Sequence, residues 1–376
     1  MNFDFGETER ALCEKIKALF DLESRAALAK LEKGDADEIR EATLKWMQIL
    51  GQAGYLTLGL DDGKNSVTLT ATQEGLASIS PSLFLTVEVT ARIFGRLVAI
   101  YGTPDQKNEI IPSLKEGRII GTVALSERGM NIENDPLVTL GVYNDDGFKV
   151  SGSKGHVVNG PIADWIAVAA KTGDGVAFFL IKKGSDGLSI DQRLSTLGYN
   201  GTAISAITLE NCSVPSAYVI GPFEVEEPVK SARTWEDQIL TAASLGQIQR
   251  SYDEAVNYAK SHLSGGKPII AYQEVGFKLA EMLTLLQTAR LLAYRAAWMT
   301  EAGDSETGVL AHCAKVFCTE SAEEVASHAL QILGGQGYIR GNPAEGSYRD
   351  AKYLQIAGTS SEISRMKIAD NVLMGQ

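Results

Sequence analysis

Two short acidic patterns carry the residues that could do proton chemistry. Glu236 and Asp237 are neighbours in one helical run, and Glu88 lies four residues before Arg92 in another. Carboxylates act as general bases when burial and neighbouring charges tune them. Adjacent residues on a helix point about 100° apart, so Glu236 and Asp237 are not expected to share one proton. Glu88 and Arg92 have the spacing of a surface ion pair, which is the interpretation we favour for them.

A glycine-rich run, LGGQG at residues 333–337, follows a long helical segment. Glycine lets a ligand approach the backbone closely. The same run is also an ordinary turn after a helix, so it indicates a ligand site only in a wider pattern.

The composition excludes several classes of protein. The chain has 376 residues, and 47 acidic against 35 basic side chains give a formal net charge of −12, which argues against a nucleic-acid binder. No apolar run is long enough for a membrane span, and the acidic N-terminus is unlike a targeting peptide. The four cysteines and four histidines show neither disulfide nor metal-ligand spacing, so we expect no metal and a cytoplasmic location.

The elements that must position these residues fall into three parts. Residues 1–120 have helical periodicity, with a Thr cap and a proline starting the segment TPDQKNEIIPSLKEG. Residues 121–225 are short β-runs, and NDDG at 144–147 predicts a hairpin. Residues 226–376 return to helices, expected at 230–263, 272–301, 305–334 and 359–374, which is typical of an antiparallel bundle.

Four stretches carry a family resemblance that covers essentially the whole chain. ALSERGMNIEND (124–135), GSKGHVVNGPIADWIAVAAKT (152–172), QILGGQGYIRGNPAEGSYRDAK (331–352) and AGTSSEISR (357–365) resemble the acyl-CoA dehydrogenase family. The resemblance implies a mostly α fold with a helical N-terminal domain, a small central β-barrel and a C-terminal four-helix bundle.

The resemblance also implies a chemistry. Members of the family desaturate an acyl thioester: a carboxylate takes the α-proton and the flavin of FAD takes a hydride from the β-carbon. The implied partners are an acyl-CoA or acyl-carrier thioester, an electron-transferring flavoprotein, and further subunits in a homotetramer or in a heteromer with a related chain.

The implied cofactor site departs from the family pattern at several positions. Ser126 keeps a hydroxyl beside the flavin, but Val158 replaces the hydroxyl that bonds flavin N5, and His262 replaces the pyrophosphate arginine. Ile132 replaces a serine that contacts substrate or flavin. By resemblance the cofactor-binding positions are Leu125, Ser126, His156, Val158, His262, Ser264, Gln331, Gly334, Gly335, Ser360 and Glu362.

The family's usual catalytic glutamate is missing. Aligned without a gap, its position falls on Gly358 and that of its bulky neighbour on Ala357, which leaves room for a branched, cyclic or otherwise bulky acyl group. Isovaleryl-CoA dehydrogenases carry the base ten residues before a glycine on the first bundle helix, and Glu236 precedes Gly246 by that spacing. Glu236 is therefore the first candidate base, unless it is a solvated acid in the helix's first turn. Glu88 is the second.

The substrate-binding candidates are assigned on the same resemblance. Glu88 and Arg92 lie on the helix that lines the acyl tunnel in this family, so Arg92 could hold a substrate carboxylate. The full set is Arg92, Ile132, Asp237, Ala357 and Gly358.

Three functions stay open. The first is an FAD-dependent dehydrogenase acting on a bulky acyl thioester with Glu236 as base. The second is a flavin-poor, non-catalytic subunit of a heteromeric acyl-CoA dehydrogenase, and the third is a non-dehydrogenating enzyme of this fold that acts on a CoA thioester.

Overall fold

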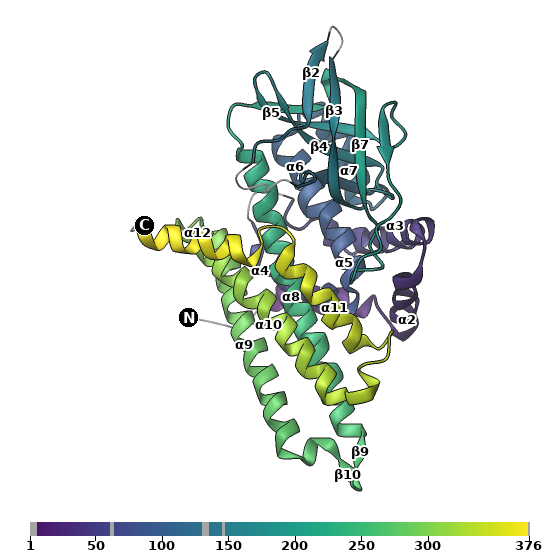
Figure 1. Cartoon of the computed structure of the whole chain (residues 1–376), viewed down its shortest axis with the longest axis vertical. Coiled ribbons are helices and arrows are strands. Elements are labelled where there is room, and N and C mark those ends of the chain that lie inside the picture. The colour runs from purple at the N-terminus through teal and green to yellow at the C-terminus, as the bar shows by residue number, and fades with distance from the viewer. Residues whose placement is uncertain (1–5, 61–63, 130–134, 145–146, 375–376) are drawn as a thin grey trace.

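The chain folds into helices, then a β-sheet, then helices again (Figure 1). The computed structural model describes residues 6–60, 64–129, 135–144 and 147–374. The first helical part contains α1 (Glu7–Ala18), α2 (Leu22–Lys30), α3 (Ala36–Gln52), α4 (Ser66–Ile79), α5 (Pro81–Glu88), a π-helix (Val89–Gly95), α6 (Arg96–Tyr101) and α7 (Pro104–Lys115). No described helix is both long and apolar enough to cross a membrane.

The predicted start of α7 is confirmed in detail. The Thr103 hydroxyl accepts a hydrogen bond from the Gln106 N–H, and the Gln106 side chain accepts one from the Thr103 N–H. Pro104 takes the first helical position, where its missing N–H costs nothing. The cap satisfies two backbone donors that the helix cannot pair internally.

The helix from α5 through the π-helix to α6 is buried along most of its length. Every residue from Pro81 to Val98 is buried, including the charged Glu88 and Arg92. The interpretation of Glu88 and Arg92 as a surface ion pair was therefore wrong. The i, i+4 spacing is common on solvated helix faces, but here both groups enter the core of the N-terminal domain.

The middle of the chain forms one eight-stranded sheet in the order β6-β7-β3-β2-β4-β5-β8, with β1 beside β4. The predicted hairpin is confirmed because β2 and β3 pair antiparallel with Asn144 opposite Gly147; its two turn residues lie outside the described part of the chain. The strands are β1 (Gly121–Ala124), β2 (Leu140–Asn144), β3 (Gly147–Val158), β4 (Trp165–Thr172), β5 (Gly175–Lys182), β6 (Leu188–Ile190), β7 (Ile204–Pro215) and β8 (Val219–Phe223).

Asn159 joins the end of β3 to the buried helix. It is fully buried and adopts a left-handed backbone conformation, with φ of 66°. Its amide Nδ2 donates to the Thr86 carbonyl oxygen at 2.9 Å, and the Thr90 hydroxyl donates to the same oxygen at 3.1 Å. The sheet and the N-terminal helices are thus linked directly behind Val158.

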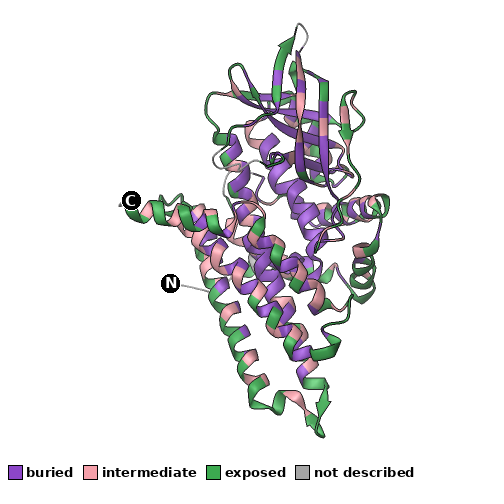
Figure 2. Ribbon diagram, in the orientation of Figure 1, coloured by how far each residue is buried: buried purple, intermediate pink, exposed green. Residues whose placement is uncertain are grey.

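The C-terminal part is a bundle around α8 (Figure 2). Its helices are α8 (Glu227–Ser261), α9 (Gln273–Ala302), α10 (Thr307–Leu333), α11 (Pro343–Ile356) and α12 (Ser361–Met374), with a short hairpin of β9 (Leu263–Ser264) and β10 (Lys267–Pro268) between α8 and α9. Four of these helices match the predicted segments, whereas α11 was not predicted. A Cβ at Gly246 would lie 2.5 Å from the Ala77 Cβ, so this glycine lets α8 pack closely on α4.

Candidate active site

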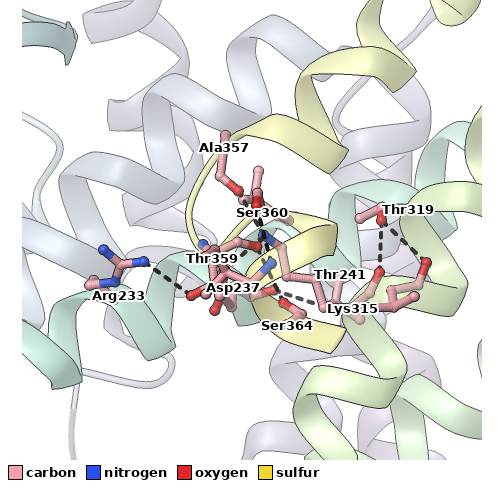
Figure 3. Close-up of polar contacts among 12 residues, drawn as sticks. Arg233, Asp237, Thr241, Lys315, Thr319, Ala357, Thr359, Ser360 and Ser364 are labelled. Carbon is pink, nitrogen blue, oxygen red and sulfur yellow. Dashed lines mark hydrogen bonds and ion pairs between the residues drawn. The ribbon is translucent and has the colours of Figure 1, made fainter. Parts of the chain in front are cut away.

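Asp237 joins α8 to the loop that follows α11. Its carboxylate is buried, and Oδ1 lies 2.9 Å from the Lys315 Nζ of α10. The same oxygen accepts a hydrogen bond of 2.8 Å from the backbone N–H of Thr359 (Figure 3). Asp237 therefore contacts both a second bundle helix and the segment between α11 and α12, which we name loop 357–360.

Lys315 holds the same loop from the other side. Its Nζ donates to the Ala357 carbonyl oxygen at 2.6 Å and also to the Thr359 carbonyl oxygen. Arg233, one turn before Asp237 on α8, donates to the Thr359 hydroxyl at 3.3 Å. Three charged side chains from two helices thus fix the loop (Figure 3).

The space next to Gly358 is filled by Asp237. Gly358 has a left-handed φ of 62°, a conformation that other residues adopt at a cost. A Cβ at this position would lie 2.5 Å from Asp237 Oδ1 and 3.0 Å from Leu240 Cδ1. The chain therefore needs glycine here, and a carboxylate side chain at 358 is incompatible with the Asp237 contact.

Glu236 occupies the third turn of α8 and is half-buried, so it is not a solvated acid in the first turn. Desolvation raises the pKa of its carboxyl, and the negative charge of Asp237 raises it further, while Lys315 and Arg233 act in the opposite direction. A carboxyl with this environment has a stronger affinity for a proton than a solvated glutamate has.

An aromatic pair lies on the same side of α8 as Glu236. The rings of Tyr353 on α11 and Tyr199 of the β-domain lie 4.9 Å apart, and the Glu236 charge contributes to the raised pKa of Tyr353 after desolvation. Gln247, three turns after Glu236, donates to the Tyr199 hydroxyl at 2.8 Å. This face of α8 is directed toward α11 and the β-domain.

Glu88 has a different environment. The Tyr55 hydroxyl donates to one of its carboxylate oxygens at 2.6 Å, and the Gln73 amide donates to the other. Arg92 lies 3.7 Å from it and donates to the backbone oxygens of Tyr55 and Leu56. Because both carboxylate oxygens are bonded within the N-terminal core, Glu88 is less available than Glu236 for taking a proton from a substrate.

Arg92 and Asp237 line one small cavity. Its volume is about 50 Å³, and it lies between α4, the buried π-helix and the bundle helices α8, α9 and α10. Gln73 and Arg96 also face it. The structure thus brings two of the predicted substrate-binding residues together, although they are far apart in the sequence.

Comparison with known proteins decides the family. The family model for the acyl-CoA dehydrogenase middle domain matches residues 122–212, and that for the acyl-CoA dehydrogenase C-terminal domain matches residues 231–373. The chain belongs to the acyl-CoA dehydrogenase family.

Individual acyl-CoA dehydrogenases cover most of the chain. It is 29% identical over 362 residues to an acyl-CoA dehydrogenase of Bacillus subtilis, covering 92% of this chain and 95% of that protein. It is 35% identical over 280 residues to the mitochondrial isovaleryl-CoA dehydrogenase of Oryza sativa, covering 71% of this chain and 67% of the relative. A Mycobacterium smegmatis glutaryl-CoA dehydrogenase in complex with FADH2 shares the fold, with a TM-score of 0.89, 21% identity, and coverage of 99% and 96%.

The β-domain carries the residues that the sequence resemblance predicts at the flavin ring. Ser126 and His156 are exposed, Val158 is half-buried, and Leu125 is buried behind them. The Gly155 N–H donates to the Ser126 carbonyl oxygen at 3.0 Å, which sets this segment beside β3. These side chains form an open face with one hydroxyl, and Val158 offers it no hydrogen-bond donor. Ile132 lies outside the described residues.

A buried ion pair between Lys154 and Glu127 contacts the backbone of this segment at Leu125. Lys154 is fully buried, and its Nζ lies 2.8 Å from Glu127 Oε1 and 3.1 Å from the Leu125 carbonyl oxygen. Glu127 also accepts hydrogen bonds from Val138 and Thr139. Despite desolvation, these bonds lower the pKa of Glu127 to about 2, while burial lowers the pKa of Lys154 to about 8.

Glu127→Gln is expected to reduce the free energy of unfolding by about 3 kcal/mol near neutral pH, because it leaves Lys154 buried without its counter-charge. The folded pKa of Glu127 lies below its ordinary value of 4.5. Its stabilisation is therefore complete above that value and is lost as the pH falls toward about 2. Urea unfolding between about pH 6 and pH 3 should show the difference from wild type shrinking; a constant difference would contradict this account.

The predicted cofactor residues His262 and Ser264 lie apart from the open face formed by Ser126, His156 and Val158. The β9–β10 hairpin, which carries Ser264, is at the far end of the bundle from β3 (Figure 1). His262 is exposed and stacks on Tyr258, with ring centroids 4.7 Å apart. Lys267 pairs with Ser264 across the hairpin, so it adds a cation that no sequence motif indicated.

The glycine run after α10 has the open geometry that a ligand needs. Gly334 has a φ of 56°, and a Cβ on Gly334 or Gly335 would meet no atom within 4 Å. Gln331 is exposed on the last turn of α10. Ser360 accepts a bond from the Ile363 N–H at 3.4 Å, and Glu362 is exposed beside it. The exposed Gln331 and glycine run would suit the polar ADP part of FAD, and the open face at Ser126 would suit its ring. Ser360 and Glu362 lie elsewhere, at loop 357–360 and the start of α12 near Lys315.

Proposed function

We propose that this chain is an FAD-dependent acyl-CoA dehydrogenase that desaturates an acyl thioester with Glu236 as the base. The observation that supports it is the environment of Glu236: it is half-buried, its pKa is raised, and the adjacent Asp237 joins it to loop 357–360. Family membership supplies the reaction class, and Glu236 supplies a carboxylate where the loop itself carries glycine.

In this proposal Glu236 takes the α-proton of the thioester. Desolvation favours the neutral, protonated carboxyl, so proton transfer to Glu236 is favoured once the substrate has displaced water. The charges of Arg233 and Lys315 act against this rise in the pKa and favour the ionised carboxylate. When bound, FAD accepts the hydride that leaves the β-carbon.

The two groups of cofactor residues are proposed to serve two FAD molecules in an assembly. The Ser126 face would hold the flavin ring of one FAD, and Gln331, Gly334, Gly335 and the β9–β10 hairpin would hold the ADP part of another. Their separation along the molecule supports this division (Figure 1). The α9 helix exposes Phe277, Leu291 and Trp298 on one side at spacings of fourteen and seven, an apolar stripe suited to a further subunit.

The proposed substrate is a thioester of CoA or of a carrier protein with a branched, cyclic or otherwise bulky acyl group. Because Asp237 fills the space beside Gly358, the added room rests on the small side chain of Ala357. An electron-transferring flavoprotein is the proposed acceptor of the electrons. Arg92 is not proposed as a substrate contact, because its small cavity is lined by Asp237 and not by Glu236.

Flavin content and flavin bleaching test this function. The purified protein is expected to be yellow, with flavin nearly stoichiometric with the chain, and anaerobic addition of a panel of linear, branched and cyclic acyl-CoAs should bleach it. Branched or cyclic members should bleach it fastest. A yellow protein that no member of the panel bleaches, alone or on a carrier protein, would contradict the proposal.

A second candidate is the flavin-poor subunit of a heteromeric acyl-CoA dehydrogenase. Val158 and the exposed, stacked His262 favour it, since both weaken the contacts that a single chain could make with FAD. A colourless protein that acquires flavin and activity only with a related subunit would support this function over the first.

A further inference from the structure

Glu236 is surrounded by charges from two helices and by a phenol from a third. Arg233 and Asp237 lie on α8 with it, Lys315 faces it from α10, and Tyr353 faces it from α11. The packed loop 357–360 adds only backbone groups and hydroxyls near the Asp237 carboxylate. The Glu236 carboxyl therefore faces two cations and one anion.

Lys315 has no hydrogen-bond donor left for Glu236. An ammonium group has three N–H donors. Those of Lys315 are matched by Asp237 Oδ1 and by the carbonyl oxygens of Ala357 and Thr359. Since Lys315 is fully buried and bonded in three directions, it affects Glu236 through its charge and through the position of its partners.

Asp237 is held away from Glu236 by the same contacts. Two adjacent carboxylates on a helix repel one another, yet Asp237 is bonded to Lys315 at 2.9 Å and to the Thr359 N–H at 2.8 Å. These bonds direct its carboxylate toward Gly358, where it leaves no space for a Cβ. One ion pair thus fixes the orientation of α8 at Glu236 and the path of the loop beside it.

We propose that Lys315 and Asp237 form a positioning pair, which holds α8 and loop 357–360 together at Glu236 and sets the net charge around the Glu236 carboxyl. This inference deepens the proposed function and rests on it for the catalytic consequence. The geometry of the pair does not depend on Glu236 being the base.

Removing Lys315 and removing the charge of Asp237 should change the proton affinity of the Glu236 carboxyl in opposite directions. Removing Lys315 leaves Asp237 uncompensated, so the Glu236 carboxyl should bind its proton more tightly. Removing the charge of Asp237 leaves two cations facing Glu236, so the carboxyl should bind its proton less tightly. A residue with a merely structural role would not move the two titrations in opposite directions.

The experiment uses Lys315→Met, Asp237→Asn and Lys315→Arg in the purified full-length protein. The readout is the pH midpoint of the Glu236 carboxyl, followed by its infrared carbonyl band and assigned by the loss of that band in Glu236→Gln. We expect the midpoint to rise by about one pH unit in Lys315→Met, to fall by about one in Asp237→Asn, and to stay near wild type in Lys315→Arg. Lys182→Met, which removes an exposed lysine paired with Glu109, is the matched control and should leave the midpoint unchanged.

Asp237→Asn keeps an oxygen for the Thr359 N–H, so it tests the inference even if Lys315→Met does not fold. The proposal of a positioning pair would be overturned if the midpoints of Lys315→Met and Asp237→Asn shifted in the same direction, or if the midpoint of Asp237→Asn stayed at the wild-type value.

The rate of flavin reduction separates the positioning pair from the proposal that Glu236 is the base. If Lys315→Met and Asp237→Asn shift the midpoint in opposite directions but Glu236→Gln keeps full activity, the pair is supported and Glu236 is not the base. If Glu236→Gln loses activity but neither of the other two variants moves the midpoint, Glu236 is supported as the base and the pair is overturned.

Discussion

Glu236→Gln is expected to lower the rate of flavin reduction by a bulky acyl-CoA by about 10²-fold to 10⁴-fold, the range contributed by a positioned general base. Glutamine keeps the shape of the side chain and cannot accept the α-proton. Glu236 is half-buried, and the contacts that hold loop 357–360 come from Arg233, Asp237 and Lys315. The free energy of unfolding should therefore change little. Anaerobic stopped-flow absorbance of the flavin measures the rate, and the unchanged flavin spectrum shows that the site still binds FAD.

Two variants make this result specific. Glu227→Gln changes an exposed acid on the same helix and should leave the rate within about twofold of wild type, as expected for a solvated charge far from the reacting atoms. Glu88→Gln should mainly lower stability, because its carboxylate bonds Tyr55 and Gln73 inside the core. Bleaching that persists in Glu236→Gln and disappears in a folded Glu88→Gln would transfer the role of base to Glu88.

Gly358→Glu is expected to destabilise the protein by about 4 kcal/mol without adding activity. The variant puts a carboxylate where the ungapped family alignment has one, but the left-handed φ of 62° strains any residue with a Cβ. The new Cβ would lie only 2.5 Å from Asp237 Oδ1, so the Asp237 carboxylate would have to move. That movement would break its buried ion pair with Lys315. Urea unfolding followed by circular dichroism gives the free-energy difference.

Gly303→Glu is the matched control for backbone strain. Gly303 ends α9 with a φ of 64°, and a Cβ there would meet no atom within 4 Å. It should cost only about 1 kcal/mol, the penalty of the left-handed conformation. Equal losses in both variants would show that the Asp237 contact does not limit residue 358, and a faster flavin reduction in Gly358→Glu would show that the loop can still carry the base.

The sequence predicts the elements whose signals are local. Thr103 and Pro104 marked the start of α7, and NDDG marked the β2–β3 hairpin, since caps and tight turns depend on a few adjacent residues. Helix α11 was missed although Asn342 caps it and Pro343 begins it, because the nearby glycines 341 and 346 weaken the helical periodicity. Eight of the nine positions from Ala71 to Ile79 on helix α4 are buried. Because this helix has no exposed polar face there, its sequence shows no amphipathic pattern that would predict it.

Only the site residues that a motif spacing or the family resemblance indicates could be predicted from the sequence. The ten-residue spacing to Gly246 pointed to Glu236. The Asp237 contact with Thr359 joins residues 122 positions apart, and the Lys315 contact with Thr359 joins residues 44 apart, so no periodic pattern could reveal them. Glu88 looked like a surface acid because its buried partners Tyr55 and Gln73 lie 33 and 15 residues away.

Asn159 has a dynamic consequence for the cofactor face. It follows Val158 directly, and its amide is bonded to the carbonyl of Thr86 on α5, one turn before the π-helix that contains Arg92. The Val158 end of β3, which is proposed to face the flavin, and the wall of the small cavity should therefore move as one rigid body. Amide hydrogen exchange in both segments is expected to slow together when FAD binds, and to become uncoupled in Asn159→Ala.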